Sequence, residues 1–193
     1  MDPRQARTRQ ALRSAVLELV ERMPLADVSV TDAARAAGIS RDTFYRHATG
    51  VGDLLAQALG AELDVSVAEF AAARGTDRER FEIAERALLA HVARHRAVYL
   101  HALAPRLAAE VRLMLLEHVE VPLRAYLAEH PEVAPVPDGE LAGDALYALY
   151  AAYGAAGTVG AIEHWLLGGA TGDADDIARG VLAVSAQWWW RGA

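Results

Sequence analysis

Hydrophobic residues recur every three or four positions along most of the chain, which is the spacing of one-sided α-helices. The first such stripe runs from Leu12 through Val16 to Met23, and Pro24 then stops the helix. No segment alternates apolar and polar residues for long enough to indicate a strand, and 42 alanines favour helix throughout. The pattern predicts an all-α protein of about nine helices, over residues 3–23, 29–37, 41–47, 53–74, 77–95, 97–103, 105–129, 138–167 and 173–190.

Two short helices near the N-terminus are separated by a tight turn. Ser29 and Ser40 are their N-cap residues by pattern, and Asp32 completes a capping box with Ser29. Gly38 supplies the stop between them. Two short capped helices around a Gly-Ile-Ser turn are typical of a helix-turn-helix, although a plain αα-corner has the same spacing.

The second short helix carries side chains that suit contact with DNA, since such a helix enters the major groove. Arg41 stands at its N-terminal end and can pair with a guanine, while Thr43 can reach a thymine methyl group or a phosphate. Tyr45 and His47 have polar tips suited to phosphates.

The composition removes much ordinary enzyme chemistry. The 193 residues include no Cys, no Lys and no Asn, and all 19 basic residues are Arg. The chain therefore has no thiolate nucleophile, no lysine for a Walker phosphate loop and no lysine for a Schiff base. We expect no catalytic residue, no cofactor and no metal.

The charge is divided unevenly along the chain. The formal net charge is −7, yet residues 1–55 hold eight Arg and seven acidic residues, whereas residues 56–193 hold eleven Arg and nineteen acidic residues. Screening confines charge interactions to about 8–10 Å, so local charge decides what the protein can contact. The N-terminal part, net +1, therefore stays compatible with DNA despite the acidic remainder.

Residues 9–60 resemble the N-terminal domain of the TetR family of bacterial transcriptional regulators. The resemblance is carried by the stripe of the first helix and by the motifs Ser29-Val30-Thr31-Asp32, Ala36-Ala37-Gly38-Ile39-Ser40, Thr43-Phe44-Tyr45-Arg46-His47 and Leu54-Leu55. The rest of the chain is similar more loosely, through its length, its helix count and the spacing Gly154…Gly157…Gly160…Trp165…Gly168. The resemblance implies a homodimer that binds a palindromic operator, with a small-molecule pocket and the dimer interface in the C-terminal domain.

The motifs and the charge together define a predicted set of DNA-contacting residues: Arg4, Arg7, Arg9, Thr31, Arg41, Thr43, Tyr45, Arg46 and His47. Two positions depart from the family pattern. Ala48 stands where the family usually has an aromatic or larger aliphatic residue, and Val51 stands where it usually has a lysine that grips a phosphate. We therefore expect few phosphate contacts near Val51 and more reliance on the N-terminal arginines.

One face of the helix over 77–95 is largely apolar and includes His91 and His95, so both histidines should point toward the interior or its rim. Their spacing of four residues can chelate zinc, but hydrogen-bonded histidines are the simpler interpretation. Ligand pockets are mainly apolar, and a largely apolar effector would fit a predicted pocket set of His91, His95, Tyr99, His118, Tyr150 and Trp165. Aromatic residues at helical spacing are more often part of a core or an interface.

The segment 145–162 is uncharged for 18 residues, which reaches the lower limit for a membrane span. Its tyrosines and glycines favour a buried helix instead, so we expect no membrane contact and a cytoplasmic protein. Small residues around Gly157 allow close helix contact, and together with the last helix they predict a four-helix dimer interface.

The sequence thus predicts a DNA-binding domain over residues 1–50 and an effector-binding and dimerisation domain over residues 51–193. The predicted function is a ligand-responsive transcriptional regulator, a repressor that binds a palindromic operator as a homodimer. The alternatives are a small helical enzyme or ligand carrier without DNA binding, and a constitutive DNA binder with no effector.

Overall fold

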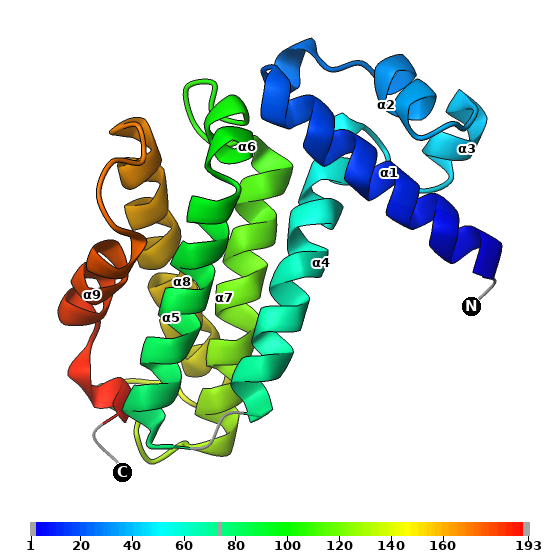
Figure 1. Ribbon diagram of the computed structural model, residues 1–193. Coiled ribbons are helices and arrows are strands. Elements are labelled where there is room, and N and C mark those ends of the chain that lie inside the picture. The colour runs from blue at the N-terminus through cyan, green and yellow to red at the C-terminus, as the bar shows by residue number, and fades with distance from the viewer. Residues whose placement is uncertain (1–2, 73–74, 191–193) are drawn as a thin grey trace. The chain divides into compact units, whose positions relative to one another are not determined.

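The computed structural model describes residues 3–72 and 75–190, and this part of the chain is helical and contains no strand (Figure 1). Its α-helices are α1 (Pro3–Arg22), α2 (Val30–Ala36), α3 (Arg41–Tyr45), α4 (Val51–Ala72), α5 (Asp77–Arg94), α6 (Arg96–His101), α7 (Ala109–Glu129), α8 (Gly143–Leu167) and α9 (Ala174–Val184). Two short 3₁₀ helices, η1 (Leu25–Asp27) and η2 (Gln187–Trp190), complete the described elements. The predicted all-α class is confirmed.

The helices form two compact units. The first unit consists of residues 1–62 and 94–114, and the second consists of residues 63–93 and 115–193. The chain passes from one unit to the other within α4, at the end of α5 and within α7.

The core of the first unit is built on the apolar stripe of α1. Leu12, Val16 and Val20 of this stripe are completely buried, as the three-to-four spacing predicts. The α1 helix packs against α2 and α6, and α2 packs against α3. Phe44 of α3 is also fully buried, so it anchors a helix of only five residues to the unit.

The second unit has a core in which aromatic side chains surround Leu127 and Trp189. Close helix contact there depends on Gly154 of α8, because a Cβ atom at this position would lie 3.0 Å from Cδ1 of Leu123 and 3.8 Å from the Trp189 ring. Gly154 therefore serves packing within the unit, whereas Gly157 and Gly160 have open space beside them.

Several helix ends differ from the predicted ones. The α7 helix begins at Ala109, not at 105, because Leu103 and Leu107 form an isolated bridge before it. The α8 helix begins at Gly143, not at 138, and α9 ends at Val184, not at 190. Ser185 adopts an extended backbone, and its hydroxyl donates a hydrogen bond to the carbonyl of Val181, which ends that helix.

Among the described helices, α8 is long and apolar enough to cross a membrane by length and composition. A core helix of a soluble protein meets the same criterion, and one third (33%) of its most apolar stretch is buried in the structure. Its fully buried residues include Ala151, Val159 and Ile162.

Candidate DNA-reading surface and effector unit

The segment from Ser29 to Ser40 folds as the capping pattern predicts. The backbone N–H of Asp32 donates to Oγ of Ser29 over 3.1 Å, and the N–H of Ser29 donates to the Asp32 carboxylate over 3.3 Å. Hydrogen bonds from Ser29 hold the pKa of Asp32 below its usual value. Gly38 has a φ of +67°, a left-handed conformation that glycine adopts without strain. The predicted capping box and glycine turn are confirmed.

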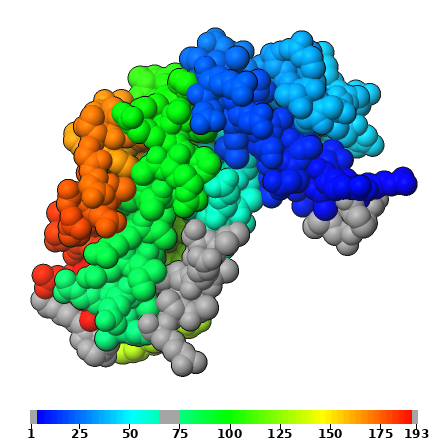
Figure 2. Space-filling model, in the orientation of Figure 1, coloured from blue at the N-terminus to red at the C-terminus, as the bar shows by residue number. Residues whose placement is uncertain are grey.

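The α3 helix presents polar side chains to solvent opposite its buried Phe44. Arg41, Tyr45 and Arg46 are exposed, and Thr43 is half-buried. Oγ of Ser40 accepts the backbone N–H of Thr43, whose Oγ1 in turn accepts a hydrogen bond from the Arg46 guanidinium over 2.9 Å. Figure 2 shows the light-blue surface of α2 and α3 open to solvent. A helix of this kind can place hydrogen-bond donors against base edges.

The remaining residues of the predicted DNA-contacting set lie in the same unit. Arg4 and Arg7 are exposed on the first turns of α1, and Arg9 is half-buried. Thr31 is exposed on α2, and His47 is half-buried just beyond α3. The structure thus brings the set to one unit, while contact with DNA stays a prediction.

Asp53 and Gln57, which the sequence interpretation did not assign to the site, join the end of α3 to the start of α4. The Gln57 side chain donates to the carbonyl of His47 and to Asp53, each over 3.1 Å. The N–H of Thr49 donates to Asp53 over 2.7 Å. Burial raises the pKa of Asp53, but the hydrogen bonds from Thr49 and Gln57 outweigh it and leave that pKa below its usual value. Asp53 and Gln57 are four positions apart on one helix, a spacing at which side chains meet, so the sequence could have indicated this hydrogen bond.

An acidic side chain lies beside the N-terminal end of α4. The carboxyl group of Glu110, from the start of α7, lies so close to Gly52 that a Cβ atom there would be 2.9 Å from the carboxyl carbon. This is beside Val51, where the family resemblance places a phosphate-gripping lysine. Glu110 is separated from Gly52 by 58 positions, so no local pattern could have indicated the contact.

The six residues of the predicted pocket set divide between the two units. His95 and Tyr99 belong to the first unit, and His91, His118, Tyr150 and Trp165 belong to the second. That all six line one effector pocket stays a prediction.

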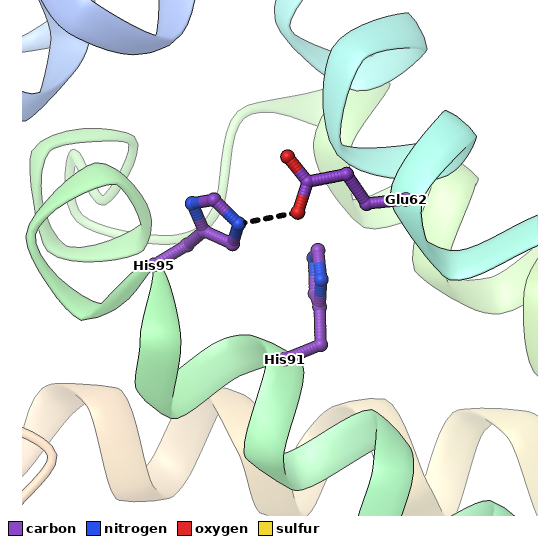
Figure 3. Close-up of side chains that lie close together, drawn as sticks. All are labelled: Glu62, His91 and His95. Atoms are coloured by element: carbon purple, nitrogen blue, oxygen red, sulfur yellow. Dashed lines mark hydrogen bonds and ion pairs between the residues drawn. The ribbon is translucent and has the colours of Figure 1, made fainter. Parts of the chain in front are cut away.

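In the first unit, Nε2 of His95 lies 2.7 Å from Oε2 of Glu62, and the Arg94 guanidinium lies 3.9 Å from the same oxygen (Figure 3). His91 stands one helical turn before His95 on α5 and is 1% exposed. Tyr99 is fully buried, and burial together with the nearby charge of Glu62 raises its pKa well above the usual value.

The polar atoms of three pocket candidates in the second unit have partners of their own. Nε2 of His118 lies 3.1 Å from the Asp64 carboxylate. The Tyr150 hydroxyl donates to the carbonyl of Pro135 over 2.8 Å. The indole N–H of Trp165 donates to the carbonyl of Thr171 over 2.8 Å, and the ring is buried. These contacts fit the alternative in which the aromatic residues stabilise the core.

The α8 and α9 helices pack against each other. Their side chains form an apolar groove. The groove has a volume of about 440 Å³, and its lining includes Trp165, Ile177, Val181 and Val184. Val184 is 86% exposed, and Tyr153 of α8 is 81% exposed. Large apolar side chains exposed to this extent often belong to a surface that contacts another molecule.

Comparison of the sequence with protein-family models and with the curated proteins finds no match. The fold, in contrast, is similar to solved structures of transcriptional regulators. The fatty acid degradation regulator FadR from Bacillus halodurans aligns with a TM-score of 0.65 at 14% identity, over 95% of each chain. A TetR-family regulator from Streptomyces coelicolor aligns with a TM-score of 0.59 at 21% identity, over 94% of this chain and 79% of that one. DhaS, a dihydroxyacetone kinase operon activator, aligns with a TM-score of 0.60 at 15% identity, over 92% and 93% of the chains. The chain therefore has the fold of TetR-like regulators.

Proposed function

We propose that this protein is a cytoplasmic transcriptional regulator without catalytic activity, which binds DNA through residues 1–50 and a small-molecule effector through residues 51–193. The observation that carries the proposal is α3. It is a short helix anchored by buried Phe44 and capped by Ser40, and it presents Arg41, Tyr45 and Arg46 to solvent. The TetR-like fold around it supports the same function.

In this function α3 enters the major groove and its N-terminal residues read base edges. Arg41 is placed to donate two hydrogen bonds to a guanine, and Thr43, Tyr45 and His47 to contact the backbone or a thymine methyl group. Arg4, Arg7 and Arg9 supply attraction to phosphates that does not depend on sequence. A homodimer presents two such helices, so its operator is a palindrome.

The effector acts by linkage. It binds the two conformations of the dimer with different affinity and favours the one whose recognition helices no longer match successive major grooves. In the proposed function the operator-bound dimer blocks transcription and the ligand releases it, so the protein acts as a repressor. A bound dimer that instead increases transcription would be an activator, the role that the name of DhaS states for that protein.

In this proposal the interface of the homodimer lies on α8 and α9. Val184 lines the groove between these helices and is exposed. Tyr153 and Leu167 of α8 are exposed too, and Gly157 and Gly160 lie between them at helical spacing with open space beside them. Packing of the same two helices from a second copy would bury this surface.

The proposal is tested by binding to the DNA upstream of the protein's own gene, followed by selection of preferred sites from random duplexes. We expect a palindromic site, and Arg41→Ala should lose base preference at one position in each half-site at a cost of about 1–3 kcal/mol. Arg86→Ala, an exposed arginine of α5, is the matched control and should keep the wild-type site. No binding to any duplex would contradict the proposed function, and an unchanged site for Arg41→Ala would contradict the role of that arginine.

A further inference from the structure

One acidic side chain stands on the exposed side of α3, among the residues proposed to contact DNA. Asp42 lies between Arg41 and Thr43, and it is exposed to solvent. Phe44, which is fully buried, follows two positions later. Two positions on an α-helix place side chains about 160° apart around its axis. Asp42 therefore points away from the core, toward the space that DNA occupies in the proposed function.

The carboxylate of Asp42 is not neutralised by an arginine of its own unit. Within residues 3–72 and 75–190, no hydrogen bond or ion pair involves this side chain. Arg46 stands four positions later, a spacing that allows a helical ion pair, but its guanidinium donates to Oγ1 of Thr43 over 2.9 Å. Arg35 of α2 pairs with Asp32 instead. The negative charge of Asp42 is thus left for another molecule.

A carboxylate on a DNA-facing helix has a cost and one specific use. The phosphates repel it on every sequence, and its oxygens can only accept hydrogen bonds. In the major groove guanine and thymine present acceptors to hydrogen-bonding groups, and adenine presents an acceptor beside its amino group. Cytosine presents the N4 amino group alone. Cytosine is therefore the base whose major-groove edge suits this side chain.

We infer that Asp42 is a specificity-determining residue that accepts a hydrogen bond from the N4 amino group of a cytosine in each half-site. Side chains at adjacent helix positions point in different directions, so this cytosine belongs to a different base pair from the guanine assigned to Arg41. Asp42 lowers the affinity for DNA in general and lowers it least where the cytosine is present. The inference rests on the proposed binding of DNA through α3.

The first test compares the site selected from random duplexes with a scrambled duplex, by anisotropy titration. Asp42→Ala should bind the scrambled duplex a few-fold more tightly, with a gain that shrinks as salt is added, because a repelled charge is gone. Its preference for the selected site over the scrambled one should fall about tenfold. Asp27→Ala removes the same charge from an exposed position of η1 and should keep the wild-type preference.

The second test identifies the base pair. Site selection with Asp42→Ala should lose a cytosine at one position of each half-site and keep the guanine that Arg41→Ala loses. Replacing that cytosine by thymine should weaken wild type about tenfold and Asp42→Ala little, because the contact is already absent. Asp42→Asn has nearly the same shape and can also donate, so its preference should change from cytosine toward adenine.

Three results would overturn the inference. The selected site of Asp42→Ala could be unchanged. Its only lost base could be the guanine of Arg41, which would make Asp42 a support for that arginine. The variant could unfold at a lower temperature with wild-type base preference, which would limit Asp42 to stabilising α3. Wild-type binding to a palindrome leaves the proposed function standing in all three cases, whereas a wild-type protein that binds no duplex contradicts both.

Discussion

The side chains of α3 are of two kinds: one holds the helix to the core, and the others are wholly or partly exposed to solvent. Phe44 is buried completely, whereas its neighbours Arg41 and Tyr45 are exposed on a helix of five residues. Such a short helix has no stability of its own, so its position depends on that anchor and on the Ser40 cap. The exposed side chains are therefore held in place without taking part in the fold, which suits residues that read another molecule.

Glu85 is the residue whose stability effect is most open to measurement. Its pKa is about 7 in the folded protein against an ordinary value of 4.5, so the unfolded chain ionises first as pH rises. Folding should therefore lose about 3 kcal/mol of stability from this group as pH rises from 4.5 to 7, with little further loss above that. We expect Glu85→Gln to lack this loss and to be more stable than wild type at pH 8, as measured by urea unfolding across that range.

The exposed Glu129 supplies the matched control for this measurement. Glu129→Gln makes the same chemical change at a solvated position and should keep the wild-type pH profile. Equal pH profiles for Glu85→Gln and wild type would mean that the Glu85 carboxyl is solvated in solution.

At the scale of elements, sequence motifs of a few residues correctly predicted the helix caps and turns that depend on contacts between neighbours in the chain. The caps at Ser29 and Ser40 and the turn at Gly38 were readable because each depends on residues within a few positions. The end of α9 was not readable, because the last aromatic residues leave the helix to pack on distant parts of the second unit. Trp189, for example, accepts a hydrogen bond at its carbonyl from Tyr126.

The candidate site follows the same division. The polar surface of α3 could be predicted from the sequence of that helix. In the structure most of its polar side chains are exposed, and the helix belongs to the first unit. The contact of Glu110 with Gly52 and the unpartnered Oε1 of Glu85 could not be predicted. Each depends on which residues distant in sequence pack nearby in the fold. The six pocket candidates were chosen by residue type, which says nothing about the unit to which each belongs.

The contact between α4 and α7 gives a prediction about DNA affinity. Glu110 places a negative charge at the α4 end where the family resemblance expects a phosphate contact, and like charges repel. We expect Glu110→Gln to bind operator DNA a few-fold more tightly, with the gain shrinking as salt is added. Anisotropy titrations at several salt concentrations measure this.

Glu117→Gln, an exposed acid farther along α7, provides the comparison for that titration. It changes the net charge equally and should change operator affinity less. Equal effects of the two substitutions would show that only net charge matters and would rule out a local role for Glu110.

For the whole molecule, the uneven charge and the exposed apolar surface define two different kinds of contact. Residues 56–193 carry a net charge of −8 from eleven Arg and nineteen acidic residues, so they repel DNA and leave the arginine-bearing N-terminal part to meet it. The exposed Tyr153 and Val184 in the second unit suit a protein partner instead. A second copy of the chain is the partner that the proposed palindromic operator would require.

Gly157 offers a clean test of that assembly because a side chain there meets open space in the protomer. Gly157→Glu should therefore leave the thermal unfolding of the protomer close to wild type while placing a charge in the middle of the proposed interface, where burial of an unpaired carboxylate is costly. We expect wild-type protein to sediment as a dimer and this variant as a monomer. Because two linked recognition helices bind a palindrome far better than one, the variant should also lose most of its operator affinity. Ala90→Glu, at an exposed position of α5, should remain dimeric, and a dimeric Gly157→Glu would move the interface away from α8.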